Sequence, residues 1–214
     1  MSGVWIMARK VDGWTLSGSS EDSQPEFKKN LKDYVYIQKK FIPESICKQS
    51  IKEIEDISFQ EHKFYDPETK TYKTRAGSHE LHMSWDNIST TQAIMENLHN
   101  AISNYQSYVN LPWFKSWNGY SPIRINKYEE KREMAMHCDH IRDMFDGERK
   151  GIPIVTILGI LNDDYKGGNF ILFDNYDVDL KEGDVLIFPS VFMYPHKVKP
   201  VTEGIRYSFV SWVW

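Results

Sequence analysis

The second half of the chain is a succession of short apolar runs rich in β-branched and aromatic residues, and this feature limits the possible folds most strongly. Turn signals separate the runs, notably Lys166-Gly167-Gly168-Asn169 and Lys181-Glu182-Gly183-Asp184. Runs of this kind predict β-strands near residues 123–128, 134–138, 154–161, 170–173, 185–188, 196–201 and 207–214. Strands at this spacing are typical of a β-sandwich or a β-barrel.

The first half contains two helical patterns. Pro43 suits the first turn of a helix that we expect to end near Asp56, and a second helix is predicted from about Thr90 to Val109. The whole pattern therefore predicts an α+β fold dominated by a jelly roll, a double-stranded β-helix, with the N-terminal helices supporting it from outside. We expect residues 1–30 to be an N-terminal extension, a hairpin followed by a flexible loop, and residues 31–214 to form one domain.

Composition excludes some classes of protein and sets an expectation for the compartment. The net charge of −4 and the pI near 6 argue against a nucleic-acid binder that relies on a strong positive field. Cys47 and Cys138 are too few for a secreted disulfide scaffold, so we interpret both as free thiols in a reducing compartment. We see no signal peptide, and the longest apolar stretch, Ile152–Leu161, is too short to span a bilayer. The expected location is therefore the cytoplasm, with no membrane partner.

A metal-binding pattern occurs in the predicted strand that runs from Met134 to Asp139. Side chains two apart on a strand point to the same face, so His137 and Asp139 should emerge together. His196 follows a later strand-like run and is the candidate third ligand. Two histidines and one carboxylate leave positions open for a keto acid and dioxygen, and this donor set favours Fe(II) over a closed structural zinc site. Taken alone, a His-x-Asp sequence is weak evidence for a metal site, because such a histidine can also be one that packs in the core or lies at the surface.

Arg206 lies ten residues after His196 in an apolar run that ends the chain. A dicarboxylate cosubstrate needs a cation to hold its far carboxylate, and a guanidinium can do this with two parallel hydrogen bonds. A buried arginine also needs an anionic partner, because an unpaired buried charge is costly. The alternative is that Arg206 occupies the exposed start of a strand. Trp212 has the same side-chain parity as Arg206, so it either lines the same pocket or packs in the core.

With these residues in this order, the chain resembles the 2-oxoglutarate/Fe(II)-dependent oxygenases, and within them the prolyl 4-hydroxylase-like branch. The resemblance extends roughly from Tyr34 to the C-terminus and is strongest from Tyr128 to Trp212. Its motifs are the strand ending in Leu161-Asn162, the Gly167-Gly168 hairpin, the run Leu180–Phe188 before His196, and then Pro200-Val201, Gly204, Arg206 and Trp212.

The resemblance implies an enzyme that consumes 2-oxoglutarate and dioxygen, releases succinate and carbon dioxide, and hydroxylates its substrate. It implies that His137, Asp139 and His196 are the catalytic residues that hold Fe(II), and that Tyr128 and Arg206 bind 2-oxoglutarate, with Trp212 beside them. Ascorbate (vitamin C) is implied as an optional reductant. Because a halogenase of this type gives up its carboxylate ligand to halide, the presence of Asp139 favours hydroxylation.

The expected substrate is peptidyl proline, as for a prolyl 4-hydroxylase, and other interpretations remain open. The segment Lys73–Ser78 resembles, weakly, a loop that covers peptide substrates in this branch. A free amino acid or another small molecule is the alternative substrate. A nucleic-acid demethylase is disfavoured, because such relatives carry a second arginine where this chain has Trp212. A non-redox jelly-roll metal-binding module is the rival outside the oxygenases, and it would not need Arg206. The oligomeric state is not readable from the sequence.

Overall fold

A computed structural model describes residues 30–214 except 67, 75–78, 113 and 140–151. The predicted N-terminal extension and most of the Lys73–Ser78 segment therefore lie outside the described residues. The helices are η1 (Leu31–Tyr34), α1 (Glu44–Ile54) and α2 (Thr91–Val109). The strands are β1 (Tyr36–Gln38), β2 (Gln60–Glu61), β3 (Phe64–Asp66), β4 (Thr71–Lys73), β5 (His82–Ser84), β6 (Arg124–Tyr128), β7 (Met134–His137), β8 (Val155–Ile160), β9 (Lys166–Gly167), β10 (Phe170–Leu172), β11 (Tyr176–Val178), β12 (Val185–Pro189), β13 (His196–Val198), β14 (Val201–Glu203) and β15 (Arg206–Val213).

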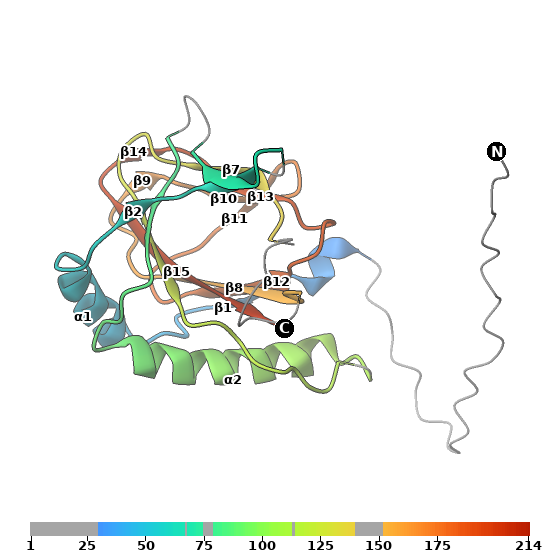
Figure 1. The fold of residues 1–214 in the computed structure, drawn as a ribbon. Helices are drawn as coiled ribbons and strands as arrows, with labels where there is room; N and C mark the ends of the chain where they lie inside the picture. Colours follow the sequence, from blue (N-terminus) through green and yellow to red (C-terminus); the bar gives the residue numbers. More distant parts are fainter. Residues whose placement is uncertain (1–29, 67, 75–78, 113, 140–151) are drawn as a thin grey trace, which may run out of the picture.

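Two antiparallel sheets face each other and the helices cover one of them (Figure 1). The major sheet has the strand order β1-β12-β8-β15-β6-β5-β2, and the minor sheet has the order β11-β10-β13-β7. Helix α2 contacts β1 and β12 on the outer face of the major sheet, while the minor sheet lies across its inner face. This arrangement is the predicted double-stranded β-helix with supporting helices.

The side-chain alternation of the major sheet builds two cores. On β8, Val155 and Ile157 belong to the cluster that the helices complete, whereas Leu158 and Ile160 belong to the cluster between the sheets. Every residue of β8 is buried, because both faces of this central strand are covered. The inner face of the major sheet is therefore the surface that can present side chains to an enclosed site.

Most predicted elements are confirmed, and the differences have local causes. Both helices lie where the helical patterns predicted them, and a strand occurs in each predicted run of the second half. The run 196–201 forms two strands, β13 and β14, separated by Lys199-Pro200, since Pro200 has no N–H to donate to a sheet. Strands β9 and β11 were not predicted: Lys166-Gly167 looks like a turn in sequence, and Tyr176–Val178 is too short to give a pattern.

None of the three helices in the described part of the chain is long and apolar enough to cross a bilayer.

Gly159 on β8 leaves the space that the ring of Phe209 on β15 occupies. The two residues are cross-strand partners, and a Cβ built on Gly159 would lie 2.0 Å from Phe209 Cζ, inside a core where Phe209 is fully buried. We expect Gly159→Ala to lower the free energy of unfolding by about 1–3 kcal/mol through overpacking, as measured by urea denaturation. Gly119→Ala is the matched control, since its Cβ would meet nothing closer than 3.5 Å. Equal stabilities for the two variants would contradict this prediction.

Candidate metal centre and adjoining cavity

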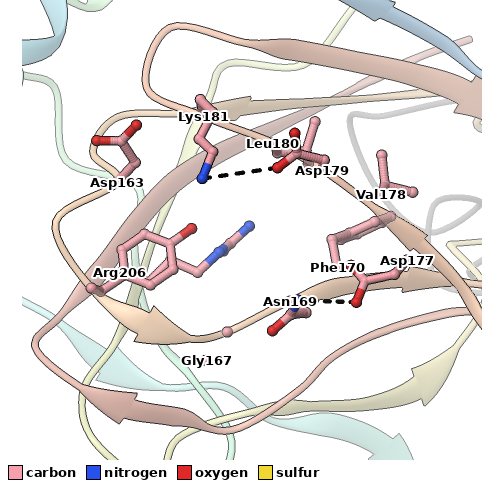
Figure 2. A pocket seen from close by; sticks show the side chains of 12 residues that line it. Asp163, Gly167, Asn169, Phe170, Asp177, Val178, Asp179, Leu180, Lys181 and Arg206 are labelled. Atoms are coloured by element: carbon pink, nitrogen blue, oxygen red, sulfur yellow. Dashed lines mark hydrogen bonds and ion pairs between the residues drawn. The ribbon is translucent and has the colours of Figure 1, made fainter.

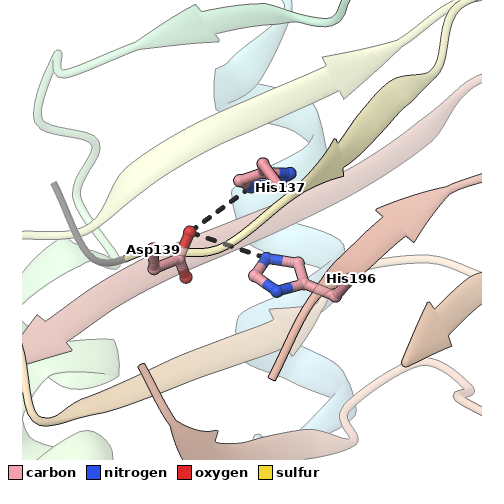
Figure 3. Close-up of side chains that lie close together, drawn as sticks. All are labelled: His137, Asp139 and His196. Atoms are coloured by element: carbon pink, nitrogen blue, oxygen red, sulfur yellow. Dashed lines mark ion pairs between the residues drawn. The ribbon is translucent and has the colours of Figure 1, made fainter. Parts of the chain in front are cut away.

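His137, Asp139 and His196 come together between the two sheets. His137 ends β7 and pairs in register with His196, which begins β13, so the neighbouring strands bring both imidazoles to one place. Asp139 lies just beyond β7 and not within it, which corrects the strand predicted to run through residue 139. The three donor atoms lie within 4.8 Å of one another. Asp139 Oδ1 is 3.3 Å from His137 Nε2 and 3.5 Å from His196 Nε2 (Figure 3).

Backbone carbonyls fix the tautomer of both histidines. His137 Nδ1 lies 2.8 Å from the oxygen of Ala135, and His196 Nδ1 lies 3.1 Å from the oxygen of Tyr194. A carbonyl oxygen only accepts hydrogen bonds, so each Nδ1 carries the hydrogen. In the neutral imidazole the lone pair is then on Nε2, the atom that faces Asp139. This is the orientation that histidine ligands of metals have, with the second nitrogen bonded to a carbonyl.

The hydroxyl of Thr156 holds Asp139, and the hydroxyl of Ser190 in turn contacts Thr156. Thr156 Oγ1 on β8 donates to Asp139 Oδ2 at 2.7 Å, and Ser190 Oγ lies 2.8 Å from Thr156 Oγ1. The carboxylate is 5% exposed, so this bond compensates part of its lost hydration. One carboxylate oxygen is thus bonded to the protein scaffold and the other is directed at the histidines. Sequence reasoning missed Thr156 and Ser190; the available signal was a hydroxyl residue inside the otherwise apolar β8 run.

The electrostatics of the cluster keep its carboxylate ionised. Burial alone raises the pKa of Asp139, but the charges and hydrogen bonds of His196 and His137 lower it to well below its usual value. Burial likewise lowers the pKa of His196, and the larger opposing effect of Asp139 raises it above the usual value. The pKa of His137 is lowered, first by burial and then by the charge of His196. The cluster therefore offers one carboxylate oxygen and at least one neutral imidazole.

The donor set fits a first-row transition metal such as Fe(II). It combines two imidazole nitrogens with one carboxylate oxygen, the combination typical of non-haem iron sites with open positions. No thiolate joins it: Cys138 points away, with its Sγ donating to the oxygen of Phe192 at 3.4 Å. Among the described residues this is the one cluster of three or more histidine, cysteine or acidic side chains able to hold a metal.

Arg206, the first residue of β15, is 1% exposed, so the alternative of an exposed strand start is wrong. Its guanidinium lies over the ring of Tyr128, 4.9 Å from the centroid, and Nη1 donates to Ser208 Oγ at 3.0 Å. Its Nε is buried and has no hydrogen-bond partner, and no acidic side chain of the described residues pairs with it. The predicted need for an anion at this buried arginine is thus not met by the described part of the protein.

A cavity of about 340 Å³ opens beside Arg206. Figure 2 shows the guanidinium extending into it between Asp163 and Lys181 on one side and Asn169 and Phe170 on the other. Phe170 also stacks on His196, with ring centroids 5.4 Å apart, so one side chain borders both the cavity and the metal cluster. The lining of the cavity does not include the three candidate ligands.

Tyr128 and Trp212 lie at opposite ends of the inner face that β6 and β15 share. Tyr128 is paired with Arg206 in the sheet register and is buried, which raises the pKa of its hydroxyl. Trp212 is paired with Thr156, the residue that bonds Asp139, so it belongs to the metal end. It is 4% exposed, and its ring lies 6.3 Å from that of Trp85. The structure therefore groups Tyr128 with Arg206 and separates Trp212 from both.

We expect Thr156→Val to weaken metal binding about 10- to 100-fold, because Asp139 would lose the donor that orients it. Valine has nearly the shape of threonine, so the thermal unfolding temperature should change little, and Thr156→Ser should restore the affinity. Titration of metal-free protein with Fe(II) or Zn(II) measures the effect. Unchanged affinity in Thr156→Val would show that Asp139 is oriented without this hydroxyl.

Residues 123–214 match the sequence model of the 2OG-Fe(II) oxygenase superfamily. A PKHD-type hydroxylase of Stenotrophomonas maltophilia is 33% identical over 99 residues, which cover 44% of this chain and 43% of that protein. A PKHD-type hydroxylase of Xylella fastidiosa is 31% identical over 109 residues, covering 43% of this chain and 44% of that protein. The chain thus matches less than half the length of these curated relatives.

Solved structures share the fold at low sequence identity. A prolyl hydroxylase from Trichoplax adhaerens, in complex with a hypoxia inducible factor oxygen degradation domain peptide fragment, has a TM-score of 0.64 at 18% identity. That match covers 85% of this chain and 84% of the other. The viral collagen prolyl hydroxylase of Paramecium Bursaria Chlorella virus-1, in its 2OG complex, has a TM-score of 0.60 at 12% identity, covering 84% and 94% of the two chains.

Proposed function

We propose that the chain, whose residues 123–214 match the 2OG-Fe(II) oxygenase superfamily, is an Fe(II)- and 2-oxoglutarate-dependent hydroxylase with a prolyl 4-hydroxylase-like site. The observation that carries the proposal is Arg206. A guanidinium that is almost fully buried, lacks an acidic partner among the described residues and borders a cavity needs an anionic ligand. A simple metal-binding module gives no reason for this arginine next to a two-histidine, one-carboxylate cluster.

Each candidate residue has a defined task in this proposal. His137 and His196 would hold Fe(II) through Nε2, and Asp139 would hold it through Oδ1. Bound Fe(II) would supply dioxygen activation, coupled to the oxidation of 2-oxoglutarate to succinate and carbon dioxide. Arg206 would bind the far carboxylate of 2-oxoglutarate.

Further residues orient these groups. Thr156 fixes the carboxylate of Asp139, and Ser208 holds one nitrogen of the Arg206 guanidinium. The Tyr128 ring supports the face of the same guanidinium, and its hydroxyl would serve as a second donor to 2-oxoglutarate. Phe170 and Phe188 pack against His196, with ring centroids at 5.4 and 5.1 Å, and would keep water from that side of a bound metal.

We further propose peptidyl proline as the substrate. Prolyl hydroxylases share this fold, and one of them is described in complex with a peptide fragment. On this chain, Phe192 is 75% exposed and its neighbour Met193 is also exposed. The Phe192 carbonyl accepts a hydrogen bond from the thiol of Cys138, which stands between His137 and Asp139 in the chain. This apolar surface therefore lies at the metal end. An exposed apolar surface next to a metal centre is suited to a segment of polypeptide.

The test is anaerobic addition of Fe(II) and then 2-oxoglutarate to metal-free protein. The keto acid should produce a weak visible metal-to-ligand charge-transfer band, and succinate, which lacks the keto group, should not. Admission of oxygen with proline-containing peptides should then raise succinate release and add one oxygen atom to the peptide. If the folded, metal-loaded protein gives no band with 2-oxoglutarate, the oxygenase proposal fails and the metal-binding module becomes the better interpretation.

A further inference from the structure

Arg124 is a second arginine on the inner face, at the metal end. It begins β6 and is paired with Val210 of β15, on the same side of the sheet as Asn126, which accepts its Nε–H at 3.0 Å. Its guanidinium carbon lies 5.1 Å from the centroid of a Trp212 ring. Asp139 and Tyr128 both act on its charge, which sets it near the candidate metal ligands. Unlike Arg206, the side chain is only partly buried and can be reached from solvent.

The charge of Arg124 is not compensated by a described residue. Among the described residues, no acidic side chain forms an ion pair with it, and its one hydrogen bond, from Nε to neutral Asn126, leaves both Nη groups available. Burial lowers the pKa of this guanidinium, which means that its desolvation exceeds the help it receives from nearby groups. An anion would stabilise a partly buried cation in this condition, and no described residue supplies one.

A buried donor without a described partner lies on the Trp212 ring that Arg124 contacts. Trp212 Nε1 is buried and has no hydrogen-bond partner in the described structure, although buried indole N–H groups usually find an acceptor. Since Trp212 is paired with Thr156, which bonds Asp139, this indole N–H and the guanidinium of Arg124 both belong to the metal end and not to the Arg206 cavity.

We propose that Arg124, assisted by Trp212 Nε1, binds a carboxylate of the primary substrate at the metal end of the site. This proposal rests on the oxygenase function and names the substrate class: molecules with a carboxylate close to the hydroxylated carbon. The carboxylate has two possible sources, the α-carboxylate of a free amino acid or an acidic group next to the target residue of a peptide. A carboxylate is preferred over a phosphate, because one guanidinium and one indole N–H offer few donors and little charge.

The experiment measures binding of matched acid and amide probes by calorimetry, with Fe(II) and 2-oxoglutarate bound and oxygen absent. One pair is L-proline and L-prolinamide; the other is an end-capped peptide with Asp or Asn after proline. For at least one pair, the acid should bind about tenfold or more tightly than the amide, as expected for a charge-assisted hydrogen bond. The pair that shows this ratio identifies the source of the carboxylate.

Variants test whether the ratio of acid affinity to amide affinity depends on Arg124. Arg124→Gln should bring the affinities for the acid and the amide to within about twofold of each other, and Arg124→Lys should keep part of the difference. Trp212→Phe retains an aromatic ring but removes the indole N–H, so it should lower the affinity for the acid. The affinity for 2-oxoglutarate should stay unchanged in Arg124→Gln. Equal binding of acid and amide, no binding of either, a ratio that survives in Arg124→Gln, or lost 2-oxoglutarate affinity in that variant would each overturn the proposal.

Failure of the proposed function is recognised separately. If the wild type itself does not bind 2-oxoglutarate, the oxygenase assignment fails, whereas the acid-to-amide ratio can still be measured on the metal-loaded protein.

Discussion

Asp139→Ala is expected to abolish 2-oxoglutarate turnover and to weaken Fe(II) binding at least 100-fold. The substitution removes a ligand and also the one negative charge between two imidazoles whose ring centroids are 4.3 Å apart. Loss of a group that merely orients a ligand typically costs about 10- to 100-fold in affinity, so the loss of the ligand itself should cost more. Metal titration of the purified variant and succinate release at saturating Fe(II) measure the two effects.

Asp56→Ala is the matched control for this prediction. It removes the same charge from an exposed position after helix α1, so metal binding and turnover should equal those of the wild type. His137→Ala and His196→Ala should reproduce the Asp139→Ala result, because all three donor atoms converge on one point. Full succinate production by Asp139→Ala would eliminate this carboxylate as an essential ligand.

The same cluster makes metal binding depend on pH. Although burial lowers the pKa of His196, Asp139 raises it above the usual value, so in metal-free protein a proton competes with the metal at Nε2. Affinity should therefore fall as the pH drops through that pKa and become independent of pH above it.

The sequence singled out the three candidate metal ligands that the structure brings together, but it did not single out the residues around them. His137 and Asp139 lie on one side of the chain, as the two-residue period of a strand predicts, even though Asp139 lies beyond the end of β7. His196 and Arg206 could be recognised only from their order along the chain. Their convergence requires the pairing of β13 with β7 and of β15 with β6, which no local pattern encodes.

Thr156 and Arg124 show the limit of a sequence interpretation. Their roles follow from cross-strand register, which pairs Trp212 with Thr156 and Val210 with Arg124. In sequence, Thr156 is one polar residue in an apolar run, and Arg124 is one of three polar residues in the run 123–128. Register is set by the packing of the whole sheet, since a shift of one residue would turn every side chain to the other face.

Arg206→Met is expected to separate cosubstrate binding from metal binding. Removing one partner of a buried, hydrogen-bonded charge pair costs about 2–5 kcal/mol, so the affinity for 2-oxoglutarate should fall about 30-fold or more. The metal ligands do not contact Arg206, and the affinity for Fe(II) should therefore stay close to that of the wild type. Arg206→Lys should recover part of the cosubstrate affinity, because it restores the charge without the two-nitrogen fork.

Measuring the free energy of unfolding of Arg206→Met separates a role of Arg206 in cosubstrate binding from a role in the stability of the fold. Without ligand, the buried guanidinium has an unpaired Nε and no described acidic partner, so its replacement by an apolar side chain of similar length should leave stability equal or increase it. Added 2-oxoglutarate should raise the thermal unfolding temperature of the metal-loaded wild type and have little effect on the variant. A variant that is destabilised yet retains wild-type affinity for 2-oxoglutarate would show that Arg206 serves the fold, and that the cosubstrate carboxylate binds elsewhere.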